Sequence, residues 1–187
     1  MLTANQLISC SHSLTMGNGH VITDTLDDGP DITKRLGNFT GQVNDVLCFF
    51  GKVSGDVKAR LFGAYCTSFY GCELWDLSGG SLSAFCMAWH KALRRIWNLP
   101  YRTHCHLLPL LCNCMPVLDE ICKRSLKFLQ TCLFHNTTLI RSVAQFSLTE
   151  GRNSSPCGRN ALFCVRRYQC ALSDIVFSIS GDPGRIS

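Results

Sequence analysis

The chain has 187 residues, of which 46% are hydrophobic and 17% are charged, with a formal net charge of +5. The apolar content is sufficient for a packed core, and the longest apolar run, Leu107–Cys112, is too short to cross a bilayer. Residues 1–80 carry five Lys and Arg against eight Asp and Glu, whereas residues 81–187 carry thirteen against five. We therefore expect the C-terminal half to bind any polyanionic partner, such as nucleic acid.

The thirteen cysteines are a high and odd number. Several stand beside Phe and Leu at core-type helical positions, where a free thiol acts as a small hydrophobe: Cys48, Cys66, Cys86 and Cys132. Met1–Ser13 lacks the basic segment and the long apolar run of a secretory signal. We therefore expect reduced thiols in an intracellular protein, cytoplasmic or nuclear and not secreted.

The first thirty residues show little regular pattern. Residues 1–18 have no sustained periodicity and are interpreted as an irregular N-terminal remnant. Residues 19–30 are predicted to form a short strand at about His20–Thr23, with no evident partner in this chain, followed by a loop.

Two helices are predicted to follow. Asp31 is a good N-cap for a helix that runs to about Phe50, and Ser54 is a good N-cap for a second helix, about Gly55–Leu74. Each has an apolar stripe at helical spacing, which predicts one buried face. The stripes are Ile32, Leu36, Phe39, Val43, Val46, Leu47 and Phe50 in the first helix, and Val57, Leu61, Tyr65, Phe69 and Cys72 in the second.

The segment Leu82–Pro109 has the clearest amphipathic pattern. On a helical wheel at about 100° per residue, one buried stripe is formed by Leu82, Phe85, Trp89, Leu93 and Ile96. The opposite side carries Lys91, Arg94, Arg95 and Asn98. Pro100 is predicted to end this helix at about Leu99.

The remaining helices are shorter or have a weaker pattern. A fourth is predicted over about Val117–Leu133 and a fifth over Thr137–Phe146. From Thr149 the composition shifts to Gly, Asn, Ser, Pro and Arg, so residues 149–187 are predicted to be a basic, largely irregular tail, with a short element at Ala161–Arg167. The sequence therefore predicts a mainly α fold: a helical bundle over residues 31–148, with an orphan N-terminal strand and an irregular tail.

No pattern in the sequence indicates a catalytic centre. Asp27 and Asp28 precede Gly-Pro and are interpreted as a solvated loop, although adjacent carboxylates can hold divalent metals. The His-x-His and Cys-x-Cys spacings leave little room for two ligands on one tetrahedral zinc ion, so we expect no metal there. This second cluster consists of His104, Cys105, His106, Cys112, Cys114 and Cys122.

The cations after Gly80 indicate a function more strongly than the Asp27-Asp28 pair or the His and Cys cluster does. Lys91, Arg94, Arg95 and Arg102 cluster without neighbouring acids, and the aromatic residues Trp97 and Tyr101 lie among them. A solvated helix face would explain such a cluster, but its aromatic neighbours and the basic half-chain favour contact with a phosphate backbone. Lys58 and Arg60, in the first turns of the second helix, are candidates for the same role.

The order of motifs resembles the end of a non-LTR (LINE-type) retrotransposon reverse transcriptase, with most similarity to the jockey, CR1 and L2-like elements. The motifs are Gly19-His20-Val21-Ile22-Thr23-Asp24, Asp28-x-x-Asp31-Ile32, Val57-Lys58-x-x-Leu61-Phe62-x-x-Tyr65-Cys66, Tyr70-x-x-x-Leu74-Trp75, Trp89-x-x-x-Leu93-Arg94-x-Ile96, Leu99-Pro100, Gly158-Arg159-Asn160 and Arg166-Arg167-Tyr168. Together they span roughly residues 18–170.

This resemblance implies the last palm strand, a helical thumb and a C-terminal extension. The active-site aspartates of that family lie in a Phe/Tyr-Ala-Asp-Asp box upstream of the Gly-His strand, and this sequence has no such box. We therefore expect an RNA-directed DNA polymerase fragment (of an endonuclease-reverse transcriptase) that is inactive alone. It would hold no cofactor, whereas the parent enzyme would use Mg²⁺. Its expected partners are the template–primer backbone and the missing palm and fingers.

Other interpretations stay open. The chain could be a helical nucleic-acid-binding module co-opted by the host, or a protein-interaction domain whose basic face meets an acidic partner. A zinc-dependent enzyme or structural zinc module at His104–Cys122 and a relic without function are further alternatives.

Overall fold

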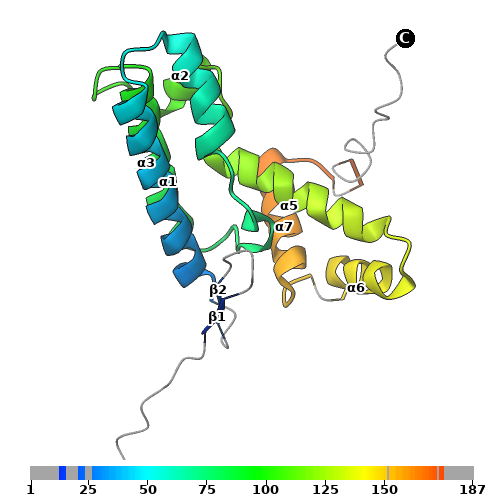
Figure 1. Ribbon diagram of the computed structural model, residues 1–187. Coiled ribbons are helices and arrows are strands. Elements are labelled where there is room, and N and C mark those ends of the chain that lie inside the picture. Colours follow the sequence, from blue (N-terminus) through cyan, green and yellow to red (C-terminus); the bar gives the residue numbers. More distant parts are fainter. Residues whose placement is uncertain (1–12, 16–20, 24–26, 151, 172, 175–187) are drawn as a thin grey trace, which may run out of the picture.

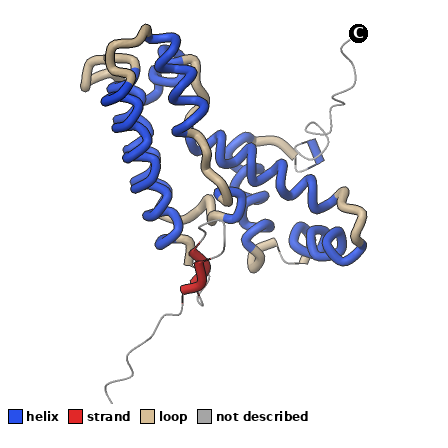
Figure 2. The backbone as a smooth tube through the Cα atoms, in the orientation of Figure 1, coloured by secondary structure: helices blue, strands red, loops and turns tan. Residues whose placement is uncertain are grey.

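The computed structural model describes residues 13–15, 21–23, 27–150, 152–171 and 173–174. The described chain is mainly α-helical, as the periodicities predict, and its helices form two groups (Figure 2). The predicted irregular segment 1–18 lies outside the described residues except for 13–15, and so does the tail beyond 174.

The N-terminal strand is not an orphan. Strand β2 (Val21–Thr23) pairs antiparallel with β1 (Ser13–Thr15), with Ser13 opposite Thr23. The prediction failed here because a three-residue strand is too short to show the alternating pattern by which a partner is recognised.

The first group of helices is a bundle in which α1 and α3 run side by side (Figure 1). The chain between them returns along the bundle as a short helix, a π-helical turn and a 3₁₀ turn. The bounds are α1 Gly29–Phe49, α2 Gly55–Leu61, η1 Phe62–Cys66, η2 Cys72–Leu74 and α3 Ser81–Ile96.

Aromatic rings fill the centre of this bundle. Phe39 of α1 lies 5.5 Å from Phe85 and 5.6 Å from Trp89, measured between ring centroids. Phe62 and Phe69, from the returning segment, contact the same Trp89 ring at 5.0 and 5.8 Å. The five side chains are each no more than 3% exposed, so this cluster is the main apolar core.

The predicted helix Gly55–Leu74 is wrong in its second half. The helix changes to a π-helical turn at Phe62, which shifts the angular position of every later side chain. Cys66 is therefore buried and Tyr65 of the predicted stripe is 60% exposed. Val57, which precedes this turn, is also exposed, at 44%, so the predicted stripe does not face the core at the start of α2 either.

The second group of helices begins after a short connection. It contains α5, α6 and α7, and α6 lies against both of the others (Figure 1). The bounds are η3 Cys105–Leu107, α4 Leu108–Cys112, α5 Val117–Leu133, α6 Thr138–Leu148 and α7 Pro156–Tyr168.

Helix α7 corrects the prediction of a largely irregular tail. Ser155 caps it by accepting a hydrogen bond from the Gly158 amide at 2.9 Å, and Pro156 occupies its first turn. Its buried residues are small or polar: Gly158, Asn160, Ala161 and Cys164. Gly, Asn, Pro and Arg in this segment are typical of loops, which is why the sequence analysis predicted most of this helix to be irregular.

No single described helix is both long enough and apolar enough to span a bilayer. One bent pair, Cys105–Cys112 with Val117–Leu133, meets the length and composition criteria jointly across a 71° break.

Candidate nucleic-acid interface

Helix α3 turns its predicted apolar stripe to the core. Phe85 and Leu93 are at most 1% exposed, and the other three members of the stripe are buried as well. Lys91 and Arg95 stand one turn apart on the exposed side, as the helical wheel predicts. The structure therefore places these two cations together on one solvent-facing stripe.

The two exposed cations differ in how they are held. Arg95 donates a hydrogen bond from Nη1 to Oδ1 of Asn44 on α1, at 2.9 Å. Lys91 makes no hydrogen bond or ion pair with any residue that the structure describes. Neither is neutralised by a carboxylate within the described chain, so both charges face solvent.

Arg94 has a different role from the one the sequence indicates. Its guanidinium donates to the Thr103 carbonyl oxygen from Nη2 at 2.7 Å and from Nε at 3.2 Å, and Nη2 also reaches Cys105 Sγ at 3.3 Å. The side chain is half-buried. It thereby ties the segment after α3 back onto the helix, a contact that depends on a residue nine positions away.

The C-terminus of α3 is closed by backbone hydrogen bonds. Asn98 adopts a left-handed conformation with φ of 52°, and the Leu99 amide donates to the Arg94 carbonyl at 2.8 Å. The Asn98 amide donates to the Arg95 carbonyl at 3.4 Å, so the pair of bonds has the Schellman pattern. The chain is thus directed into the Pro100–Thr103 turn at a fixed angle.

Arg102 is exposed in that turn, beside the exposed Tyr101. On α2, which contacts α3, Arg60 is exposed and Lys58 is half-buried. The ends of α1 and α3 and the start of α2 lie together at the top of Figure 1. The six predicted cations are therefore distributed over α2, α3 and the turn that follows α3.

A second polar cluster joins residues that the family motifs single out. The buried carboxylate of Asp31 accepts a hydrogen bond from Trp75 Nε1 at 2.8 Å and one from the Val21 amide at 3.1 Å. Asp28 Oδ2 accepts from the Asp76 amide at 2.6 Å. These contacts attach strand β2 and the start of α1 to the chain after η2.

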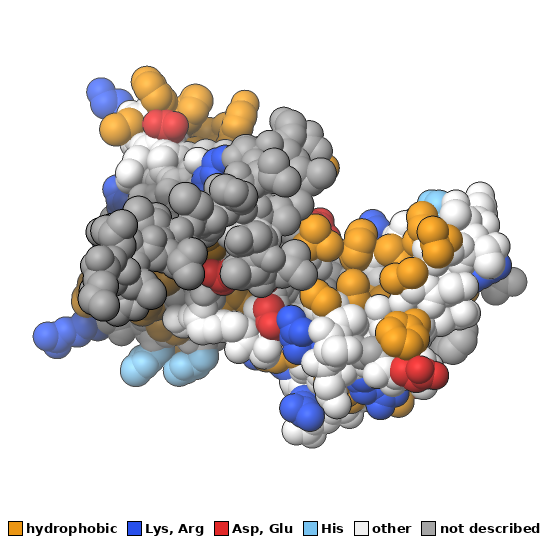
Figure 3. Space-filling view, turned by 90° about the horizontal axis from the view of Figure 1, so that it is seen from below, with side chains coloured by type: hydrophobic (Ala, Val, Ile, Leu, Met, Phe, Trp, Pro, Cys, Tyr) orange, Lys and Arg blue, Asp and Glu red, His pale blue; other side chains and the backbone are white. Residues whose placement is uncertain are grey.

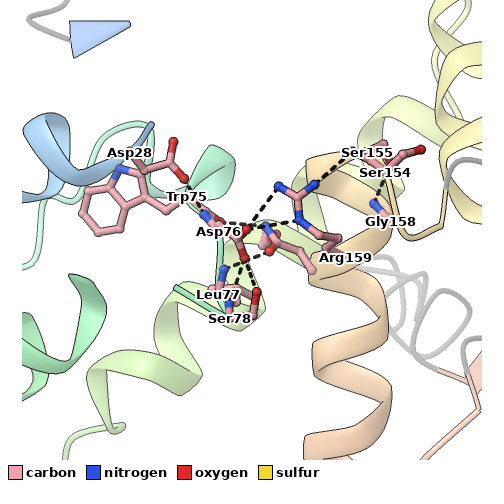
Figure 4. Close-up of polar contacts among 11 residues, drawn as sticks. Asp28, Trp75, Asp76, Leu77, Ser78, Ser154, Ser155, Gly158 and Arg159 are labelled. Atoms are coloured by element: carbon pink, nitrogen blue, oxygen red, sulfur yellow. Dashed lines mark hydrogen bonds and ion pairs between the residues drawn. The ribbon is translucent and has the colours of Figure 1, made fainter. Parts of the chain in front are cut away.

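Helix α7 reaches the same cluster from the other side (Figure 4). Asn160 accepts from the Leu77 amide at 2.9 Å and donates to the Trp75 carbonyl at 2.7 Å. Arg159 pairs with Asp76 at 3.1 Å and donates to the Ser154 carbonyl at 2.9 Å. The junction cluster, as we call it, connects the two groups of helices and consists of Val21, Asp28, Asp31, Trp75, Asp76, Asn160 and Arg159.

Within this cluster the pKa values of Asp28 and Asp76 are shifted in opposite directions. Burial raises the pKa of Asp28, more than the hydrogen bond from the Asp76 amide lowers it, and the neighbouring carboxylates raise it further. Burial would also raise the pKa of Asp76, but hydrogen bonds from Ser78 and the Arg159 guanidinium outweigh it, so the pKa is lowered.

The carboxylates of Asp27 and Asp28 both accept hydrogen bonds from backbone amides. Asp27 Oδ1 accepts from the Gly29 amide at 3.0 Å, and Asp28 faces the Asp76 amide. Within the part of the chain that the structure describes, no group of three or more His, Cys, Asp and Glu side chains is arranged to hold a metal ion. The rings of His104 and His106 stack at 5.4 Å and both side chains are exposed.

The twelve described cysteines are free thiols. Burial raises the pKa of Cys66 to about 11 and that of Cys72 to about 12, so these thiols stay protonated at neutral pH. Cys48, predicted to be a core residue, is exposed together with Cys105. The apolar stripe of α1 turns away from Cys48, which explains that correction.

Three comparisons with known proteins give no match: no family model, no curated protein and no solved structure is significantly similar to this chain.

Proposed function

We propose that this chain is a C-terminal, thumb-like portion of a LINE-type reverse transcriptase that binds the template–primer backbone without catalysing nucleotide transfer. Lys91, Arg95 and Arg102 would contact phosphates, with Lys58 and Arg60 on the neighbouring helix. Arg94 would act chiefly as a positioning residue, since its guanidinium already binds the Thr103 carbonyl. The two-metal chemistry would belong to a Phe/Tyr-Ala-Asp-Asp box, which this sequence does not contain.

The observation that carries the proposal is the convergence of the family motifs on one structural cluster. Val21, Asp31 and Trp75 belong to three separate motifs. The Val21 amide and Trp75 Nε1 donate hydrogen bonds to the two oxygens of the Asp31 carboxylate. Asn160, from a fourth motif, binds the Trp75 carbonyl 85 residues away. Scattered chance matches have no reason to meet in space, so this convergence supports common descent of the motifs as one unit.

The surface supports the same proposal by its charge. Lys91 and Arg95 project from a helix whose other side is locked into an aromatic core, so their backbone positions are fixed. Cations on a rigid face contact phosphates without reading sequence, and such binding weakens as salt displaces the released counterions.

The test is fluorescence anisotropy of the full chain with a labelled RNA–DNA hybrid at several salt concentrations. We expect tight binding at low salt and a steep loss at higher salt. The double variant Lys91→Glu/Arg95→Glu should weaken binding and lower the slope of log affinity against log salt by about 2, roughly one unit for each phosphate that the variant no longer neutralises.

The matched control is Lys123→Glu/Lys127→Glu, which reverses two exposed cations at the same spacing on α5. It should leave the salt slope nearly unchanged, because α5 lies in the other group of helices. Equal losses in the two double variants would contradict the assigned face and indicate only a dependence on net charge.

A protein-contact role is a second candidate, and the outer face of α6 favours it. Leu139, Val143 and Phe146 stand on one stripe and are 72%, 56% and 55% exposed. Figure 3 shows apolar side chains gathered over this part of the molecule. An apolar helical face of this kind is typical of a protein contact, and under the family resemblance the palm and fingers would supply it.

Light scattering after size-exclusion chromatography tests that second role. If the α6 face binds protein, the wild-type chain should self-associate as its concentration rises, and Val143→Asp/Phe146→Asp should remain monomeric. A wild-type chain that is monomeric throughout would show that this face does not bind a second copy of the chain.

A further inference from the structure

Tyr101 is the most exposed large apolar side chain in the described chain, at 87%. It stands in a tight turn that the Thr103 amide closes by donating to the Pro100 carbonyl at 3.0 Å. A tyrosine ring can bury well over 100 Å² in a core, and here that surface contributes nothing to folding. The ring is therefore available to a ligand.

The turn that presents Tyr101 is rigidly anchored. Arg94 holds the Thr103 carbonyl with two hydrogen bonds, and the left-handed Asn98 fixes how the chain leaves α3. An exposed ring on a fixed support loses little conformational entropy when a partner stacks on it. Arg102, the next residue in the turn, is exposed as well, so the same turn presents a cation to solvent.

The surrounding end of the bundle has the same combination of rings and cations. Phe49 and Phe50, where α1 ends, are 78% and 39% exposed. The exposed charges of this end are mostly positive, with Lys52, Arg95 and Arg102 against Asp45 and Asp56. Exposed aromatic rings interspersed with cations are the composition of single-strand binding surfaces.

We propose that this end of the bundle binds single-stranded nucleic acid, with a base stacked on Tyr101 and its flanking phosphates on Arg102 and Arg95. The proposal rests on the proposed function and specifies the form of the polymer. In a duplex both faces of each internal base are already stacked, so an exposed ring gains nothing there. In a single strand every base offers a free face.

The experiment is anisotropy of the full chain with a labelled polythymidine strand and, separately, with a blunt duplex of equal length. Tyr101→Ala should weaken single-strand binding roughly tenfold and leave duplex binding unchanged. Tyr101→Phe keeps the ring and should bind the single strand like the wild type. Tyr65→Ala is the matched control, because Tyr65 is also exposed, at 60%, but lies on η1.

Each outcome has a separate meaning. Single-strand affinity that is unchanged in Tyr101→Ala overturns the stacking proposal, even if charge reversal at Lys91 and Arg95 still weakens binding. Binding of the duplex alone also overturns it and leaves the proposed function in place. Failure to bind any polymer at low salt overturns both proposals.

Discussion

The two groups of helices achieve their stability by different means. In the first, Phe39 packs against the rings of four other residues, and large side chains from α1, η1 and α3 interlock. In the second, α5 adds Val117, Ile121 and Leu126 to the same core, and a separate small cluster consists of Leu129, Ala144 and Ala161. The first group and α5 thus gain mostly from apolar burial, whereas α6 and α7 depend on the close approach of small residues.

The comparison also explains why α6 is the least embedded long helix. Only Ala144 and Ser147 of α6 are buried, and its large apolar residues face solvent. A helix that buries so little has a small free energy of local unfolding. The aromatic bundle should therefore be the last part of the molecule to open.

The largest expected effect comes from Phe39→Ala. Removal of a ring that is 2% exposed and packed among other rings should cost about 3–5 kcal/mol in the free energy of unfolding. Urea denaturation followed by tryptophan fluorescence measures it. Phe49→Ala, on the same helix but 78% exposed, is the matched control and should cost no more than about 0.5 kcal/mol.

Gly158→Ala should have the next largest effect. A Cβ atom there would meet the Arg152 Cα and carbonyl oxygen at 2.7 Å and also the Ser147 carbonyl, so α6 and α7 would have to separate. We expect a loss of about 1–3 kcal/mol in thermal or urea unfolding.

Gly41→Ala is the control for Gly158→Ala and should have an effect of the opposite sign on stability. Gly41 lies in α1, and no atom stands within 4 Å of the place that an alanine methyl group would take, so alanine should stabilise the helix by up to about 1 kcal/mol. A Gly158→Ala protein as stable as the wild type would contradict the close approach of α6 and α7.

The junction cluster should respond to acid. Because the pKa of Asp76 is lowered from its ordinary 3.8, its ion pair stabilises the fold above that pH and the stabilisation is lost as pH falls through the folded value. Asp28, whose pKa is raised, contributes with the opposite sign: protonation favours the fold, and this contribution disappears as pH rises through its folded value.

The measurement is the unfolding midpoint between about pH 2 and 6 for the wild type and Asp76→Asn. The wild type should lose stability on the acid side, and the variant should show a flatter profile. Identical profiles would show that ionisation of Asp76 does not stabilise the fold.

The smallest expected effect is a difference in the rate at which individual cysteines are alkylated at low urea. Cys48 and Cys105 are exposed and should react first in the native protein. Cys132 and Cys157, which border the small cluster of the second group, should become reactive before Cys66 and Cys72 in the bundle. Mass spectrometry of alkylated peptides gives the order. Simultaneous labelling of all four would indicate that the molecule opens as one unit.

Local sequence alone determined the strongest helices and their orientation. The spacing of Leu82, Phe85 and Trp89 was sufficient to predict the buried side of α3, because a regular α-helix fixes the angle between residues. The same geometry predicted that Lys91 and Arg95 are exposed. Where the helix is irregular, as at Phe62, the fixed angle no longer applies: Tyr65 of the predicted stripe is exposed, although Phe69 and Cys72 are buried as predicted.

The tertiary structure decided the features that depend on residues far apart in the chain. Arg94 looked like a third exposed cation, and only the returning Thr103 carbonyl gave it a partner. The composition of helix α7 is typical of a loop, and the position of the helix depends on Asn160 and on the close contact at Gly158. Helical periodicity is a local property that the sequence carries, whereas hydrogen-bond partners and close backbone contacts exist only once distant segments meet.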